Sequence, residues 1–244
     1  MRLDVYMVEK EIVDTRSKAK KLIENGAISL DGKTITKASY EMSEDFDLNK
    51  IVLDEAQNKY VSRGGYKLEA ALTSFKINCD GKVALDVGAS TGGFTDCLLL
   101  NNASKVYAVD SGTAQLSPKI AKDARVVSIE NYNARFMKRE DFAESIDLVV
   151  MDVSFISQTL ILPQIASVLQ KNGELISLIK PQFEVGKDLV GKKGIVKDEK
   201  ARQMAINKVC DLAKELNFEL LGLIQSPIKG GDGNIEFLAY FKRN

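Results

Sequence analysis

The fold is decided by the stretch Val83-Ala84-Leu85-Asp86-Val87-Gly88-Ala89-Ser90-Thr91-Gly92-Gly93-Phe94. Its first five residues have the mainly apolar composition of a buried strand. Glycines then interrupt the pattern before a second apolar run around Leu98. A strand, a glycine-rich turn and a helix in this order open a parallel βαβ unit. The stretch therefore predicts an α/β fold built on a parallel sheet.

Apolar runs of strand length continue on the C-terminal side, separated by segments long enough for helices. They cover residues 106–110, 126–129, 148–152 and 175–179. Two more runs, 218–225 and 235–241, close the chain. The connection between these two is too short for a helical crossover, so they should pair antiparallel. We predict a Rossmann-like α/β domain whose seven-stranded sheet is mostly parallel, with the last strand antiparallel.

The N-terminal region has a different pattern and predicts a small separate α+β domain. Asp14 and Thr15 offer an N-cap for a helix over 16–25, and Gly26 offers its C-terminal stop. The runs 27–30 and 34–36 flank Asp31-Gly32, a hairpin signal, and 51–53 adds a strand. Because residues 54–59 are polar, we predict domains over 1–58 and 59–244.

The composition excludes several kinds of site. The chain has no histidine, which removes histidine bases, serine–histidine–aspartate triads and histidine-based metal sites. Its three cysteines are far apart and suggest neither a disulfide framework nor a zinc cluster. No apolar run suits a signal peptide or approaches the roughly 20 residues of a membrane span. We therefore expect a cytoplasmic protein that needs no metal.

The glycine turn and two acids predict a cofactor site. Asp110 ends the next strand roughly 20 residues after the turn, where a carboxylate can bind both hydroxyls of a ribose. This spacing alone also allows a dinucleotide. However, the first strand carries Asp86 near its end and the turn is not G-x-G-x-x-G, features typical of S-adenosylmethionine sites. Taken singly, Gly88 is explained by an ordinary tight turn and Asp110 by a solvated strand end.

Four further polar residues lie before, at or near the strand ends. Lys67 precedes the first strand, Asp152 and Lys180 end the fourth and fifth strands, and Glu236 lies in the last. Since the carboxyl ends of parallel strands share one edge, Asp152, Lys180 and the glycine turn should converge. Taken singly, each lysine fits a surface residue, Glu236 a solvent-facing position and Asp152 a helix cap.

In the order Lys, Asp, Lys, Glu, these residues resemble the catalytic tetrad of FtsJ-like RNA ribose methyltransferases. The motifs around them resemble those of TlyA-type, or hemolysin A-like, rRNA methyltransferases, and cover residues 62–68, 86–94, 152–157 and 180–184. Residues 2–4, 15–19 and 25–26 resemble the S4 RNA-binding domain. The resemblance therefore covers almost the whole chain.

The resemblance implies S-adenosylmethionine-dependent 2′-O-methylation of ribose, on cytidine, in ribosomal RNA within one or both ribosomal subunits. The attacking hydroxyl must lose a proton, and we assign Lys180 as the base. Burial and a second cation at Lys67 should disfavour its charged form, while Asp152 and Glu236 hold the geometry. The expected cofactor contacts are Asp86, Gly88, Ala89, Ser90, Thr91, Gly92, Gly93, Phe94, Asp110, Asn133 and Asp152.

The formal net charge is zero, with 34 basic and 34 acidic residues, so RNA binding must rest on local clusters and on shape. We expect RNA contacts from Arg2, Arg16, Lys18, Lys20, Lys21, Lys33, Arg63 and Tyr66. The plainer explanation of the basic residues between 16 and 21 is a solvated helix face. Likewise, Tyr66 and Phe183 fit either base stacking or packing.

Two other classes of function remain open. A non-catalytic ribosome-binding or assembly factor would keep the fold without turnover, but the intact tetrad argues against it. A pore-forming hemolysin would need an amphipathic or membrane-spanning segment, and the sequence offers neither. We therefore expect no membrane partner and rank the hemolysin last.

Overall fold

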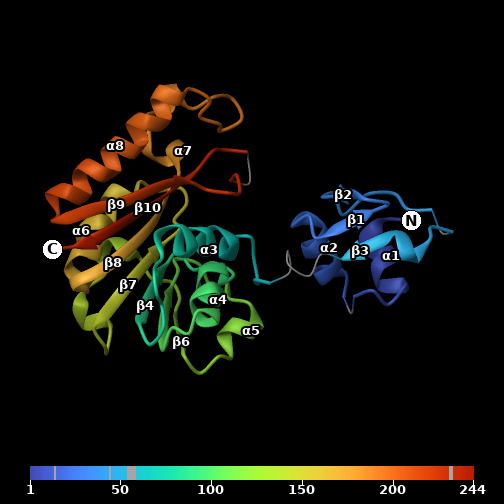
Figure 1. The fold of residues 1–244 in the computed structure, drawn as a ribbon, viewed down its shortest axis with the longest axis horizontal. Helices are drawn as coiled ribbons and strands as arrows, with labels where there is room; N and C mark the ends of the chain where they lie inside the picture. Colours follow the sequence, from blue (N-terminus) through green and yellow to red (C-terminus); the bar gives the residue numbers. More distant parts are fainter. Residues whose placement is uncertain (14, 44, 54–58, 231–232) are drawn as a thin grey trace. The chain divides into compact units, whose positions relative to one another are not determined.

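The computed structural model describes residues 1–13, 15–43, 45–53, 59–230 and 233–244. The chain divides into two compact units, Met1–Ser62 and Arg63–Asn244 (Figure 1). The sequence placed the division after residue 58, within a segment of which 54–58 lie outside the described residues.

The first unit packs two helices against a small antiparallel sheet. The helices are α1 (Leu3–Glu9) and α2 (Arg16–Glu24), and the strand order is β2 (Lys33–Ile35), β1 (Ile28–Leu30), β3 (Ile51–Leu53). A short 3₁₀ helix, η1 (Leu48–Lys50), precedes β3. Thr15 Oγ1 accepts the Lys18 amide hydrogen bond at 3.2 Å, which confirms the predicted N-cap, whereas Asp14 lies outside the described residues.

The predicted hairpin of the first unit is also confirmed. Asp31 and Gly32 join β1 to β2 and both have left-handed backbone angles, with φ of 50° and 79°. Two consecutive positive φ angles are what a tight two-residue hairpin requires, and Gly32 adopts one without steric cost. The core of the unit lies between the helices and the sheet and includes the buried residues Tyr6, Leu22 and Ile28.

The second unit is built on a seven-stranded sheet in the order β6-β5-β4-β7-β8-β10-β9. The pairs from β6 through β8 are all parallel, whereas β10 runs antiparallel to both β8 and β9. This is the mostly parallel sheet with an antiparallel last strand that the sequence predicts. Its strands are β4 (Val83–Val87), β5 (Lys105–Val109), β6 (Val126–Ile129), β7 (Ile146–Met151), β8 (Leu169–Ile179), β9 (Phe218–Gln225) and β10 (Phe237–Arg243).

Helices cover the sheet of the second unit on both sides. They are α3 (Gly64–Phe75), α4 (Gly93–Leu100), α5 (Pro118–Ala121), α6 (Leu162–Val168), α7 (Pro181–Glu184) and α8 (Glu199–Glu215), with short 3₁₀ turns η3 (Ala134–Phe136), η4 (Arg139–Asp141), η5 (Gln158–Leu160) and η6 (Lys187–Leu189). Leu85 belongs to a core cluster with residues of α6 and α8. Its neighbour Asp86 points to the other face, where it meets Thr95 of α4.

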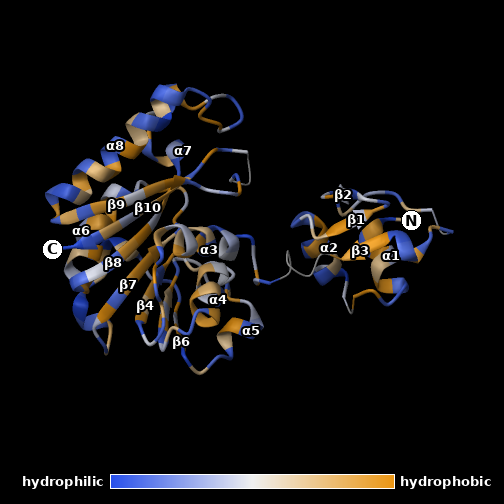
Figure 2. Cartoon of the chain, viewed as in Figure 1, coloured by the Kyte–Doolittle hydropathy of each residue, from blue (hydrophilic) through white to orange (hydrophobic). Residues whose placement is uncertain are grey.

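Apolar side chains gather in the strands, and polar residues in the outer helices. Figure 2 shows the central strands as mainly hydrophobic, whereas much of α8 is hydrophilic. The core contains the fully buried Leu85, Val149 and Ile179, and Val209 of α8 packs onto it. Among the described residues, none of the helices has the length and apolarity needed to cross a membrane.

Sheet register brings the predicted site residues to one edge. Val87 lies opposite Met151, and Met151 lies opposite Ser177, so β4, β7 and β8 end at the same side. Antiparallel β10 begins there, with Phe237 opposite Ile179. Glu236 therefore immediately precedes β10 and Lys180 immediately follows β8, on neighbouring strands.

Candidate active site and cofactor cavity

The four residues of the predicted tetrad form two ion pairs. Lys180 Nζ lies 2.5 Å from Asp152 Oδ1, and Lys67 Nζ lies 2.6 Å from Glu236 Oε2. Lys67, Lys180 and Glu236 are buried, and Asp152 is partly exposed. The sequence predicted a cation at Lys67 that disfavours the charge on Lys180. The structure instead gives each ammonium group a carboxylate of its own, as buried charges require.

Lys180 has a second polar neighbour that the sequence analysis missed. Its ammonium donates a hydrogen bond to Ser154 Oγ at 2.8 Å. Ser154 follows β7 by three residues and, like Asp152, lines a cavity at the carboxyl edge of the sheet. The side chains of Asp152 and Ser154 thus hold the Lys180 ammonium group at the wall of this cavity.

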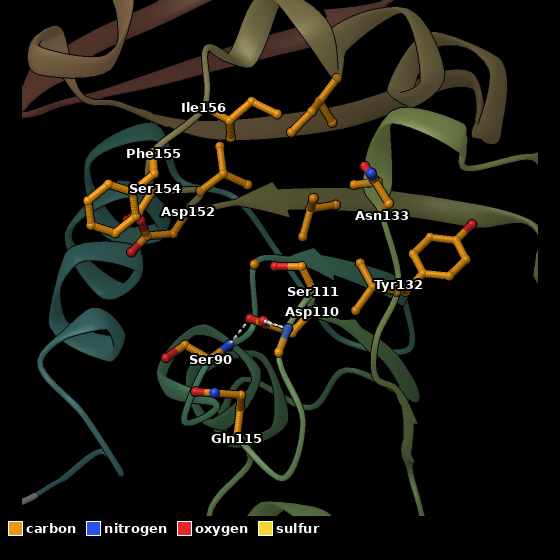
Figure 3. Close-up of a pocket in the computed structure, with 17 residues that line it drawn as sticks. Ser90, Asp110, Ser111, Gln115, Tyr132, Asn133, Asp152, Ser154, Phe155 and Ile156 are labelled. Carbon is orange, nitrogen blue, oxygen red and sulfur yellow. Dashed lines mark hydrogen bonds between the residues drawn. The ribbon is translucent and has the colours of Figure 1, made fainter.

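This cavity has a volume of about 460 Å³, within the range of about 300–1,000 Å³ that is common for small-molecule sites. Five of the predicted cofactor residues line it, namely Gly88, Ser90, Asp110, Asn133 and Asp152. Figure 3 shows side chains from the β4, β5 and β7 ends facing the same space. The lining residues that the sequence did not predict include Ser111, Gln115, Tyr132, Ser154, Phe155 and Ile156.

The glycine turn packs against β7. Gly88 has φ +83°, and a Cβ atom at this position would lie 2.5 Å from the Asp152 carbonyl oxygen. Gly92 has φ +90°, and a Cβ atom there would meet side chains of Leu116 and Ile120 at 3.1 Å. Glycine is therefore required for the backbone conformation and for close packing. At Gly88 this packing sets the cavity wall beside Asp152.

On the other side of the cavity, Asp110 joins the glycine turn to the loop that follows β5. Its Oδ2 accepts a hydrogen bond from the Ser90 amide and its Oδ1 accepts one from the Gly112 amide, both at 2.7 Å (Figure 3). Each oxygen of an ionised carboxylate can accept more than one hydrogen bond. Asp110 is thus oriented by the backbone and retains acceptor capacity for a ligand in the cavity.

Asp86 lies beneath the turn, outside the cavity lining. Thr95 Oγ1 donates to its Oδ2 at 2.6 Å, while its buried Oδ1 has no hydrogen-bond partner among the described residues. Burial raises the pKa of Asp86 to about 7, and the nearby Asp152 charge adds to the shift while the Thr95 hydrogen bond opposes it. A buried carboxyl group with a spare acceptor favours a cation nearby.

The remaining predicted cofactor residues do not line the cavity. Ala89 and Phe94 are buried in the packing around the turn. Gly92 and Gly93 form the N-cap and first residue of α4, and Thr91 is exposed, with its carbonyl accepting a hydrogen bond from the Ser117 amide. These residues therefore shape the glycine turn, whereas Gly88 and Ser90 of the same turn line the cavity.

A buried carboxylate ties together the two turns that carry the Lys180 site. Glu184 Oε2 accepts a hydrogen bond from Ser157 Oγ at 2.5 Å, and Oε1 accepts one from the Gln158 amide at 2.7 Å. Lys208 of α8 lies 3.5 Å from Glu184 Oε2. Burial raises the pKa of Glu184 against these hydrogen bonds. Thus Ser157 and Glu184, the last residues of two predicted motifs, join those motifs to each other.

In the first unit, a second buried carboxylate holds two of the predicted RNA-binding arginines. Asp4 is 1% exposed, and it accepts hydrogen bonds from Arg2 Nε and Arg16 Nε at 2.9 and 2.8 Å. Both guanidinium groups remain largely exposed. The other predicted RNA contacts of this unit, Lys18, Lys20, Lys21 and Lys33, are exposed, whereas Arg63 and Tyr66 belong to the second unit.

Two family profiles match most of the chain. The S4 domain matches residues 1–45, and the FtsJ-like methyltransferase family matches residues 60–243. The chain belongs to the FtsJ-like methyltransferases. The family that the sequence motifs predicted is therefore confirmed, together with the S4 domain at the N-terminus.

Relatives of this FtsJ-like methyltransferase match over almost its full length. It is 37% identical to the 16S/23S rRNA (cytidine-2′-O)-methyltransferase TlyA of Mycobacterium tuberculosis, covering 99% of this chain and 89% of that protein. It is 44% identical to Hemolysin A of Brachyspira hyodysenteriae, covering 99% of both. A solved structure from Streptococcus thermophilus, provisionally assigned as a hemolysin, matches with TM-score 0.78 and 40% identity, covering 100% of this chain and 88% of that one. The chain is thus of the TlyA type.

The FtsJ-like methyltransferase fold implies S-adenosylmethionine as the methyl donor. The cavity fits such a ligand in two ways that the structure shows. Asp110 offers oriented carboxylate oxygens to a ribose. Asp86 lies beneath the turn, and its buried Oδ1 has no hydrogen-bond partner among the described residues. The negative residues Asp110 and Asp152 both line the cavity, which suits a sulfonium and an α-ammonium group.

Proposed function

We propose that this protein transfers the methyl group of S-adenosylmethionine to a ribose 2′-hydroxyl of ribosomal RNA. The observation that carries the proposal is the position of Lys180, a buried amine bound to two residues of the cavity wall, Asp152 and Ser154. The name of the Mycobacterium tuberculosis relative supports cytidine in the RNA of one or both ribosomal subunits as the target. This substrate implies a cytoplasmic location.

The cavity residues divide the recognition of the cofactor between them. We assign Asp110 to bind the ribose hydroxyls of the cofactor. The backbone at Gly88 and Ser90 faces the ligand, and Asn133 is assigned to the side where the base of the cofactor binds. Bound S-adenosylmethionine supplies a methyl group on a positively charged sulfur that leaves as a neutral thioether. The protein therefore needs mainly to position the acceptor hydroxyl and to remove its proton.

Lys180 takes the proton of the hydroxyl in this scheme. The neutral amine is the form that can accept this proton. Asp152 and Ser154 fix the nitrogen by contacts at 2.5 and 2.8 Å. After transfer, the ammonium group forms again and Asp152 compensates its charge. The Lys67–Glu236 pair holds the start of α3 against the start of β10 and so fixes that side of the site.

The first unit binds the RNA in this proposal. Its match to the S4 domain supports the role, and the exposed guanidinium groups of Arg2 and Arg16 supply the positive charge for phosphate oxygens. Its basic residues Lys18, Lys20, Lys21 and Lys33 add to the same electrostatic attraction, and Arg63 and Tyr66 contribute from the second unit.

The test is methyl transfer from labelled S-adenosylmethionine to purified ribosomal subunits, followed by mass-spectrometric mapping of ribose methylation. We expect label on the ribose of cytidine in one or both subunits, and its loss from the rRNA of cells that lack the gene. No incorporation with either subunit would reject the proposal and favour a non-catalytic assembly factor. Incorporation on a base rather than on ribose would reject the role of Lys180 as the base for a hydroxyl.

A further inference from the structure

The segment between α7 and α8 is strongly basic in a chain of zero net charge. Residues 186–197 contain four lysines and one aspartate, for a formal charge of +3. All four lysines are exposed: Lys187, Lys192, Lys193 and Lys197. In the part of the chain that the structure describes, no carboxylate pairs with any of these ammonium groups. The segment therefore carries positive charge that the protein itself does not neutralise.

This segment also encloses a hollow of about 750 Å³ that is separate from the cofactor cavity. Apolar and charged residues line it together. The apolar ones are Leu189, Val190 and Ile195, and three lysines, Lys192, Lys193 and Lys197, outnumber the two acids, Asp188 and Asp198. Leu189 is 39% exposed, so its side chain is accessible to a ligand in the hollow. Apolar surface beside several ammonium groups suits a ligand that combines a flat, weakly polar body with a negative charge.

Hydrogen bonds fix the segment beside Glu236 of the predicted tetrad. The Val196 amide donates to Asn234 Oδ1 at 2.9 Å, and Asn234 Nδ2 donates to the Gly194 carbonyl at 2.8 Å. Asn234 is buried and stands two residues before Glu236. The loops before α8 and before β10 accordingly lie side by side (Figure 1). A ligand in the hollow would thus be held at a set position relative to the tetrad.

We infer that the 186–197 segment binds the single-stranded RNA next to the target nucleotide. In this inference, which rests on the proposed function, Lys192, Lys193 and Lys197 contact phosphates. The apolar residues take the face of an unstacked base. Phosphates account for most of the affinity in such contacts, and unstacked bases pack on apolar or aromatic side chains. The segment therefore acts in the second unit as an RNA contact additional to the S4 domain.

The first experiment replaces two lysines of the hollow and compares them with two distant ones. We expect the double variant K192Q/K193Q to raise KM for ribosomal subunits roughly tenfold, with kcat and S-adenosylmethionine affinity unchanged. The slope of log KM against log salt should fall by about 0.7 for each phosphate that the variant no longer binds. The control K171Q/K214Q changes exposed lysines at the start of β8 and the end of α8, and should match the wild type. Equal KM values for both double variants would overturn the inference.

The second experiment identifies the partner directly. A photo-crosslinking amino acid at Leu189 should attach to ribosomal RNA when the protein is irradiated with subunits. Attachment only to a ribosomal protein, or no attachment while subunits are bound, would overturn the inference. The crosslinking readout measures binding without turnover, so it remains valid if the wild type transfers no methyl group. That result would reject the proposed function alone.

Discussion

Lys67 Nζ lies 2.6 Å from Oε2 of Glu236, although the two residues stand 169 positions apart. The pair joins the first helix of the second unit to its last strand, and both side chains are buried. Removing one partner of a buried pair leaves the other charge without compensation, whereas replacing both with apolar residues often costs little. The pair therefore allows stability and catalysis to be separated by mutation.

Glu236→Leu should lower the free energy of unfolding by about 3–5 kcal/mol, because the Lys67 ammonium loses its partner. The double variant K67M/E236L should recover most of that stability in urea unfolding yet remain inactive in methyl transfer. A double variant as unstable as the single one would show that packing, rather than charge compensation, accounts for the loss.

The base role predicts that Lys180→Ala reduces single-turnover methyl transfer by about 10²–10⁴-fold. Its affinity for S-adenosylmethionine, measured by calorimetry, should stay nearly unchanged, since Lys180 does not itself line the cavity. Lys180→Arg keeps the charge but should be equally inactive, because a guanidinium group does not release its proton. An arginine variant with substantial activity would limit Lys180 to an electrostatic role.

Much of this site could be predicted from the sequence because it depends on local patterns. The glycine turn is an example, since Gly88 and Gly92 have the positive φ angles that their residue type suggests. Phe94 was predicted to contact the cofactor, but it lies buried outside the cavity lining. Short-range patterns do not say which side of a turn faces a ligand.

The contacts that hold the site in place were not predictable in the same way. Ser154, Glu184 and Asn234 are ordinary polar residues in sequence, and their roles arise from partners 26 to 40 positions away. The only local signal was their place within recognised motifs, for Ser154 and Glu184, or close to Glu236, for Asn234. Similarly, the last strand was predicted from residue 235, whereas β10 begins at Phe237 and leaves Glu236 just before it. Such details depend on how loops pack.

Asp86 predicts a measurable pH dependence of stability. Its pKa is raised from 3.8 to about 7, so the folded state holds this proton more tightly than the unfolded state does. The contribution of Asp86 to stability should therefore fall as the pH rises from about 4 to 7, by up to about 4 kcal/mol. Asp86→Asn keeps the size but cannot ionise, and should gain stability relative to the wild type over this range. Parallel pH profiles of the two proteins in urea unfolding would contradict the assignment.

The Glu184 contacts predict coupling between two residues outside the tetrad. Ser157→Ala and Glu184→Gln each remove part of the connection between the turns that carry Ser154 and Lys180, and each should lower kcat about tenfold. The double variant should be little worse than either single one, because both break the same connection. Gln203→Ala, on the exposed side of α8, is the matched control and should not change kcat. Fully additive losses would show that the two residues act independently.

Asp4 gives a prediction in which orientation and net charge disagree. Burial opposes the charge on Asp4, but hydrogen bonds from Arg16 and Arg2 outweigh it and lower its pKa below 3.8, so the carboxylate stays ionised at neutral pH. Asp4→Asn removes one negative charge, and simple electrostatics then predicts tighter binding to RNA. We expect the opposite, a KM for ribosomal subunits about five- to tenfold higher, because both guanidinium groups lose the anchor that orients them.

The variant Arg16→Lys tests the orienting role of Asp4 while Asp4 itself stays unchanged. It keeps the positive charge but loses the directed Nε contact at 2.8 Å, and should weaken subunit binding by a similar factor. Circular dichroism and thermal unfolding of both variants show whether the first unit stays folded, and Lys20→Arg, at an exposed position on the same helix, is the control. Because orientation and charge predict opposite signs for a folded Asp4→Asn variant, tighter binding than the wild type would reject the role of Asp4 in presenting the two arginines.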